Sequence, residues 1–180
     1  MKLNNYCVLD IETTGLSYIN NEIIEIGILK VRKNEIIDSF NQLVKPKYNI
    51  PREITDITHI DNKMVENAPN INSVLFKMLE FIEDLPLIIH NAPFDISFLE
   101  YNLNKLGITM KNEVIDTLKL SRAIYRNFEK HSLQYLAEKL NIEVNNAHRA
   151  LEDTKTLFEV FKKIENSISY KMSISQVNEV

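Results

Sequence analysis

Short apolar runs in the first third of the chain predict β-strands. Residues 6–10 form one such run, of the kind found in a central strand that is buried on both faces. Apolar and other residues alternate in 23–31, as they do in a strand. A third strand is predicted at 35–44 after a turn at Asn34, so the second and third strands are expected to form a hairpin.

Beyond about residue 50 the apolar spacing becomes that of helices. Apolar residues recur every three or four positions, which is the period of a helix with one buried face. Two short apolar runs, at 86–89 and 114–115, interrupt this pattern and predict further strands. Helices are predicted at residues 51–54, 72–83, 93–106, 117–125, 132–140 and 147–164.

This order of elements predicts an α/β domain with one mixed sheet flanked by helices. A strand meander followed by strands that alternate with helices is typical of that class. Strands 6–10 and 86–89 are expected to be parallel neighbours at the centre, and the carboxyl ends of such strands are where sites form. We expect a domain over residues 1–166 and a short polar tail over 167–180.

The composition favours a globular, cytoplasmic protein. The chain has 180 residues, of which 44% are hydrophobic and 26% are charged, close to the average of soluble proteins. No apolar stretch approaches the ~20 residues of a membrane span, so we expect no membrane segment. The single cysteine, Cys7, is expected to be a buried small hydrophobic residue in a reducing compartment.

The formal net charge of −4 limits how the protein could bind nucleic acid. Lys and Arg total 21 against 25 Asp and Glu, which argues against a broad basic face. Acidity does not argue against binding phosphates through metal ions, because bound cations would offset the acids that hold them. We therefore expect an affinity for nucleic acid that depends strongly on divalent ions.

Two carboxylates come together where the first strand is expected to end. Asp10 and Glu12 are two residues apart, so in a strand both side chains point to the same face. Carboxylates that close repel each other, and either one is protonated or a cation lies between them. Two exposed acids at a strand end are the alternative.

Two further acids follow apolar elements. Asp95 falls in the first turn of the helix after strand 86–89, where a capping acid is the alternative to a ligand. Asp153 occupies a slot in the apolar stripe of the last helix, where a carboxylate is costly unless it is in a salt bridge or binds a metal. His148 lies at the expected start of that helix, where it could face the same cleft.

An α/β sheet would bring these four acids and one histidine to the same edge. Carboxylate oxygens suit Mg²⁺ or Mn²⁺ rather than structural zinc. Mg²⁺ held by a few carboxylates completes its shell with water and substrate phosphates. The set therefore predicts phosphoryl chemistry with two metal ions.

At these residues the sequence resembles the DEDDh branch of the DnaQ-like 3′–5′ exonucleases, a family typified by the proofreading epsilon subunit of bacterial DNA polymerase III. The family motif D-x-E-T-T-G matches residues 10–15, H-N-A-x-F-D matches 90–95 and H-x-A-x-x-D matches 148–153. The resemblance covers residues 6–165. It implies a ribonuclease H-like fold, with a five-stranded mixed sheet of order 3-2-1-4-5.

The resemblance also implies a role for each of the five residues. Asp10, Glu12 and Asp153 would hold the Mg²⁺ or Mn²⁺ that carries the attacking water. Asp10 would also bind a second such ion, and Asp95 would act through metal-bound water. His148 would be the general base that deprotonates the nucleophile.

A pocket for the 3′-terminal nucleotide is implied as well. Leu16 would wedge against the terminal base, and Gly15 would let the backbone approach the nucleotide closely. His59 ends a segment whose usual order in the family is His-Gly-Ile-Thr, so its histidine is displaced here. As alternatives, the threonines could belong to a turn and Phe94 to the core. The expected lining residues are Thr13, Thr14, Gly15, Leu16, His59, Phe94 and His148.

The resemblance predicts a metal-dependent exonuclease that releases nucleoside 5′-monophosphates from 3′ ends of single-stranded or frayed DNA, in proofreading or repair. An exonuclease for RNA or short oligonucleotides would use the same residues, so the substrate stays open. A catalytically silent nucleic-acid-binding module is a further alternative. A phosphatase with an aspartyl nucleophile is weaker, because it would need a second Asp at Glu12. The implied partners are the polymerase III alpha subunit and the sliding clamp.

Overall fold

Five strands form one mixed sheet in the order β3-β2-β1-β4-β5, as predicted. The computed structural model describes residues 3–144 and 147–177, with side chains through Ser169. β1 pairs antiparallel with β2 and parallel with β4, and β2 pairs antiparallel with β3, which confirms the hairpin and the central parallel pair. The strands are β1 (Asn5–Thr13), β2 (Ile23–Arg32), β3 (Glu35–Leu43), β4 (Leu87–Ile89) and β5 (Val114–Asp116).

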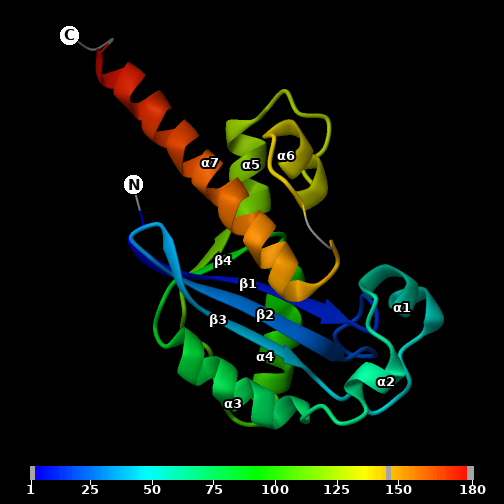
Figure 1. Cartoon of the computed structure of the whole chain (residues 1–180). Coiled ribbons are helices and arrows are strands. Elements are labelled where there is room, and N and C mark those ends of the chain that lie inside the picture. Colours follow the sequence, from blue (N-terminus) through cyan, green and yellow to red (C-terminus); the bar gives the residue numbers. More distant parts are fainter. Residues whose placement is uncertain (1–2, 145–146, 178–180) are drawn as a thin grey trace.

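Helices cover both faces of this sheet. The helices are α1 (Arg52–Thr58), α2 (Asn62–Val65), α3 (Ile71–Ile82), α4 (Pro93–Lys105), α5 (Thr117–Ile124), α6 (Leu133–Lys139) and α7 (Ala150–Val177). α3 and α4 lie on one face, and α5, α6 and α7 lie on the other (Figure 1). The short helices α1 and α2 lie beyond the end of the strands where β1 terminates (Figure 1).

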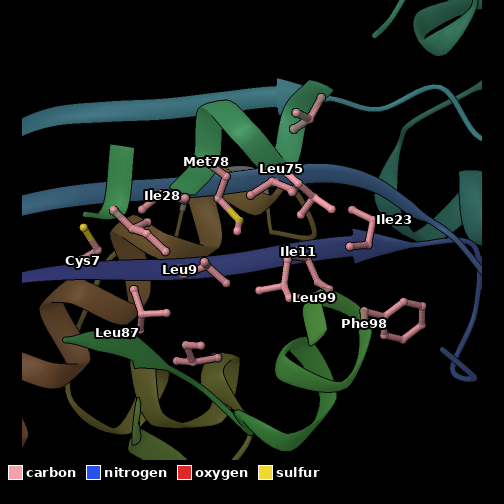
Figure 2. Close-up of a cluster of buried hydrophobic side chains, with 14 of the residues drawn as sticks. Cys7, Leu9, Ile11, Ile23, Ile28, Leu75, Met78, Leu87, Phe98 and Leu99 are labelled. Carbon is pink, nitrogen blue, oxygen red and sulfur yellow. The ribbon is translucent and has the colours of Figure 1, made fainter. Parts of the chain in front are cut away.

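Strand β1 separates two hydrophobic cores because its side chains alternate between the two faces. Cys7, Leu9 and Ile11 pack with residues of β2, α3 and α4, as Figure 2 shows. Tyr6 and Val8 point the other way and pack against α6 and α7. The positions that continue the second face beyond Val8 are polar, so a polar patch begins where this core ends.

β1 is longer than the apolar run predicted. It continues to Thr13 because the residues that alternate with its two carboxylates, Ile11 and Thr13, are buried while pairing with β2 persists. The helix α2 was not predicted from the sequence. Its four residues are held by Asp61, whose carboxylate accepts the Met64 N–H at 2.8 Å.

The last helix differs from the prediction at both ends. It begins at Ala150 rather than at 147, because His148 has φ 66°, a left-handed conformation that a helix does not continue through. It continues to Val177 rather than ending near 164, so the part of the predicted tail from 167 to 177 is helical. The domain boundary at 166 stays a prediction.

The structure shows the environment of the single cysteine and the lengths and hydropathy of the helices. Cys7 is buried, and burial raises the pKa of its thiol to about 12, which keeps it protonated and unreactive. Among the residues that the structure describes, no helix is both long enough and apolar enough to cross a membrane.

Candidate active site

Three of the predicted acids meet on the face of the sheet that α7 covers. Asp10 and Glu12 both belong to β1, and Asp153 lies in the first turns of α7. One carboxylate oxygen from each of the three lies within 4.8 Å of the others. The predicted shared face of Asp10 and Glu12 is therefore confirmed, and the last helix supplies the third carboxylate.

Asp95 also lies next to this group, but it comes from α4, which covers the opposite face of the sheet from α7. It occupies the first turn of α4, is 3% exposed, and its Oδ1 accepts the Ile11 N–H at 3.2 Å. Ile11 lies between the two strand acids, so this bond places the Asp95 carboxylate beside β1. Asp95 is outside the group of three that could share one ion, although all four acids gather at one edge.

His148 lies immediately before α7 and is exposed. Its backbone N–H donates to Oδ2 of Asp153 at 3.1 Å, so the Asp153 carboxylate contacts the turn that precedes α7. Burial raises the pKa of Asp153, and the hydrogen bond from His148 and the charge of its side chain oppose that rise, so the imidazole lies within electrostatic range of the carboxylate. The structure thus places the predicted general base beside the acids, at the solvent side.

Burial raises the pKa of all four acids. For Asp10 burial is the largest cause, the charges of the neighbouring acids add to it, and its pKa stands well above the usual value. Burial, followed by the charges of Asp153 and Glu25, raises the pKa of Glu12 to about 8. Burial raises that of Asp95 to about 8, against hydrogen bonds that lower it. Without a cation this edge therefore binds protons.

One oxygen of Asp153 shows that the residues fit a divalent cation. Asp153 Oδ1 is buried and has no hydrogen-bond partner in the described part of the chain. A buried carboxylate oxygen without a partner costs free energy. A cation bound between the three acids would remove that cost. An all-oxygen donor set of this kind suits Mg²⁺ or Mn²⁺.

Two residues of this region were missed from the sequence. Glu25 of β2 is fully buried and forms a two-pronged ion pair with Arg149, with Nη2 at 2.7 Å from Oε1 and Nε at 3.1 Å from Oε2. The available signal was a charged residue between Ile24 and Ile26 in a mainly apolar strand, because such a charge needs a partner if both faces are covered.

The loop after β1 carries the predicted pocket residues. The Thr13 hydroxyl donates to the Gly15 carbonyl at 2.7 Å, and the Thr14 hydroxyl accepts the Glu22 N–H at 2.9 Å, so both hydroxyls are used within the loop. A Cβ on Gly15 would lie 2.6 Å from Nδ2 of Asn21, so the loop itself requires glycine there. Leu16 is 88% exposed at the loop surface.

The remaining two pocket residues lie on different elements. Phe94 of α4 is half-buried and packs against Phe98 with ring centroids 5.2 Å apart, so it belongs partly to the core. His59 is exposed after α1, with φ 58°. It lines a cavity of about 430 Å³ together with Asn41, Arg149, Leu151 and Glu152. The displaced histidine therefore faces the start of α7.

Known proteins have sequences similar to that of this chain. The family model described as exonuclease, RNase_T, matches residues 7–161. The chain is 44% identical over 175 residues to the PolC-type DNA polymerase III of Caldanaerobacter subterraneus subsp. tengcongensis, and 43% identical over 174 residues to that of Clostridium perfringens. Each match covers 97% of this chain and 12% of the relative, so the chain spans a small part of these polymerases.

Solved structures share the fold. Exonuclease X in complex with 5′-overhanging duplex DNA matches with a TM-score of 0.75 and 27% identity, over 90% of this chain and 92% of that one. The nuclease domain of 3′hExo, a DEDDh family member, matches with a TM-score of 0.78 and 19% identity, over 91% and 92%. E. coli exonuclease I in complex with single-stranded DNA matches with a TM-score of 0.81 and 17% identity, over 96% of this chain and 43% of that one. The predicted ribonuclease H-like fold is confirmed.

We predict that the metal-free protein becomes less stable as the pH rises from about 4.5 to about 8. The folded-state pKa values of Glu12 and Asp95 are raised to about 8, so in this range the folded chain binds more protons than the unfolded chain. Urea unfolding in chelator at several pH values measures this slope. Glu12→Gln should flatten the slope.

Glu83→Gln is the matched control for this experiment. Glu83 is an exposed acid whose pKa is lowered by its hydrogen bond from Lys30, so it stays ionised across the range. Its substitution should leave the pH slope unchanged. A stability that is constant or rises between these pH values would contradict the raised pKa values.

Proposed function

This chain belongs to the exonuclease family, in its DnaQ-like DEDDh branch, and we propose that it removes nucleoside 5′-monophosphates from the 3′ ends of single-stranded or frayed DNA. The observation that carries the proposal is the convergence of Asp10, Glu12 and Asp153 within 4.8 Å, with one buried carboxylate oxygen lacking a partner among the described residues. Such a site binds a phosphodiester through cations rather than through basic side chains.

The residues at this edge have separate tasks in the proposed reaction. Asp10, Glu12 and Asp153 hold two Mg²⁺ or Mn²⁺ ions, with Asp95 completing the acidic edge from α4. When bound, these ions supply positive charge to the phosphate in the transition state and make water a stronger acid. The exposed imidazole of His148 accepts a proton from the attacking water, which is the task of a general base.

DNA and proofreading are the proposed context because the chain is 44% and 43% identical to two PolC-type DNA polymerases. The polymerase and its sliding clamp are the proposed partners. The net charge of −4 agrees with a protein that handles one strand end at a metal site, rather than one that grips a long duplex. If the protein prefers RNA to DNA, RNA replaces DNA as the proposed substrate.

The loop after β1 is the proposed recognition element for the terminal nucleotide. Leu16 lies four residues after Glu12 and is 88% exposed, so packing does not explain a large apolar side chain there. Thr13, Thr14, Gly15, His59 and Phe94 complete the proposed pocket, with His148. A wedge of this kind stacks on any base, so no sequence preference is expected.

We predict that the protein shortens a 5′-labelled oligonucleotide from its 3′ end when Mg²⁺ or Mn²⁺ is present. Chelator should abolish the reaction, and His148→Ala should slow it about 10²- to 10⁴-fold because the general base is lost. Asp38→Asn, which changes an exposed acid of β3, should have no effect.

Gel analysis of the same reaction on RNA of equal length decides the substrate class. Faster cleavage of DNA supports the proposal, and faster cleavage of RNA replaces DNA with RNA as the substrate. Absence of shortening, or shortening that resists both chelator and His148→Ala, would contradict the function itself.

We predict that Leu16→Ala lowers kcat/KM on single strands about tenfold while leaving the melting temperature unchanged. The side chain is 88% exposed, so its removal opens no cavity, whereas it removes apolar contact with the terminal base. Ile19→Ala is the matched control, since Ile19 is 63% exposed in the same loop. Equal effects of the two substitutions would show that Leu16 has no special position.

A further inference from the structure

Glu25 is a fully buried carboxylate that the proposed chemistry does not use. It lies in β2, and its two oxygens accept three hydrogen bonds from the start of α7. Two come from the Arg149 guanidinium, at 2.7 and 3.1 Å, and the third comes from the Ala150 N–H at 2.9 Å. An arginine fork on a carboxylate fixes orientation as well as distance.

Gly27 of β2 brings the same helix start into contact with the strand. A Cβ at this position would lie 2.4 Å from the Ala150 carbonyl carbon and 2.4 Å from the Leu151 nitrogen. No side chain fits in that space, so the backbone of the first turn rests directly on the strand. We call Glu25, Gly27, Arg149 and Ala150 the α7 anchor.

The strand register places this anchor beside the carboxylates. Glu25 pairs with Glu12, and Gly27 pairs with Asp10, so each anchor residue on β2 lies next to one of the β1 acids on the same face. Glu25 would repel Glu12 if it were unpaired, and a side chain at position 27 would crowd Asp10. These same two positions of β2 contact the start of α7.

The anchor also fixes Asp153 in α7 and His148 just before that helix. The Asp153 N–H donates to the Arg149 carbonyl at 2.9 Å, in the first turn of the helix. The Asp153 carboxylate in turn accepts the His148 N–H. A rotation of this turn would therefore move the third carboxylate and the histidine together.

We propose that Glu25 and Arg149 are positioning residues that hold Asp153 and His148 in register with the carboxylates of β1. The inference rests on the proposed function. A buried ion pair adds little net stability compared with apolar residues of the same volume, whereas its two-pronged geometry selects one orientation. Arg149 also offsets a negative charge that would otherwise lie unpaired beside Glu12.

The test compares Glu25→Gln, Arg149→Met and the double variant with the wild-type chain. Mn²⁺ affinity is measured by electron paramagnetic resonance of the free ion, and kcat and KM are measured on a single-stranded oligonucleotide, all well below the melting temperature. We expect each single variant to weaken Mn²⁺ binding and to lower kcat about 10- to 100-fold, with KM changed by less than about threefold. The double variant should resemble the single variants, because the pair acts as one unit.

Two further variants separate positioning from charge and from general stability. Arg149→Lys keeps the charge and loses the fork, so it should recover only part of the activity. Lys155→Met breaks an ion pair of the same 2.7 Å length on α7, with Glu152, and should change neither Mn²⁺ affinity nor kcat. In the metal-free protein, the Ala150 amide should exchange with solvent faster in Glu25→Gln than in Lys155→Met.

Several results would overturn the proposal. The proposal is wrong if Glu25→Gln and Arg149→Met fold and keep the Mn²⁺ affinity and kcat of the wild-type chain. It is also wrong if the loss of activity in each variant equals the fraction of molecules that is unfolded. Full recovery by Arg149→Lys would show that charge alone matters. A wild-type chain that binds Mn²⁺ but cleaves nothing refutes the proposed function, while weaker binding in Glu25→Gln would still support the anchor.

Discussion

The burial of neighbouring carboxylates, to which their mutual repulsion adds, is the constraint on which this structure depends. Four acids from three elements gather at one edge of the sheet, and burial raises the pKa of each of them. The guanidinium of Arg149, whose charge acts on Glu12, is already bound to Glu25. Such a cluster is fully ionised only when cations offset its charge, and this is the physical basis for proposing divalent ions at this edge.

The sheet meets this constraint through the alternation of β1. One face of the strand is apolar from Cys7 to Ile11, and this face fixes the strand against α3 and α4. The other face is apolar only as far as Val8, after which the two carboxylates point toward α7. The apolar side chains of β1 therefore hold the strand in place, while its two carboxylates lie outside both hydrophobic clusters. The neighbouring strand β2 contacts the start of α7, the helix that carries Asp153.

The sequence predicted the fold class, the strand order and the shared face of Asp10 and Glu12, because these follow from apolar periodicity and from recognisable motifs. It did not predict where α7 begins, since the left-handed conformation of His148 depends on its bond to Asp153. Glu25 was missed because an alternating strand suggests one exposed face, whereas both faces of β2 are covered. Arg149 stood inside a motif, yet its partner is 124 positions away in the sequence.

The central claim is that the carboxylates of this edge bind a pair of divalent cations. The most direct measurement is anomalous diffraction from crystals of the chain grown with Mn²⁺ and a nucleoside 5′-monophosphate. The account predicts two manganese peaks bounded by Asp10, Glu12 and Asp153, and their loss in Asp10→Asn. Manganese bound elsewhere, or no peak at this edge while the nucleotide is bound, would contradict it.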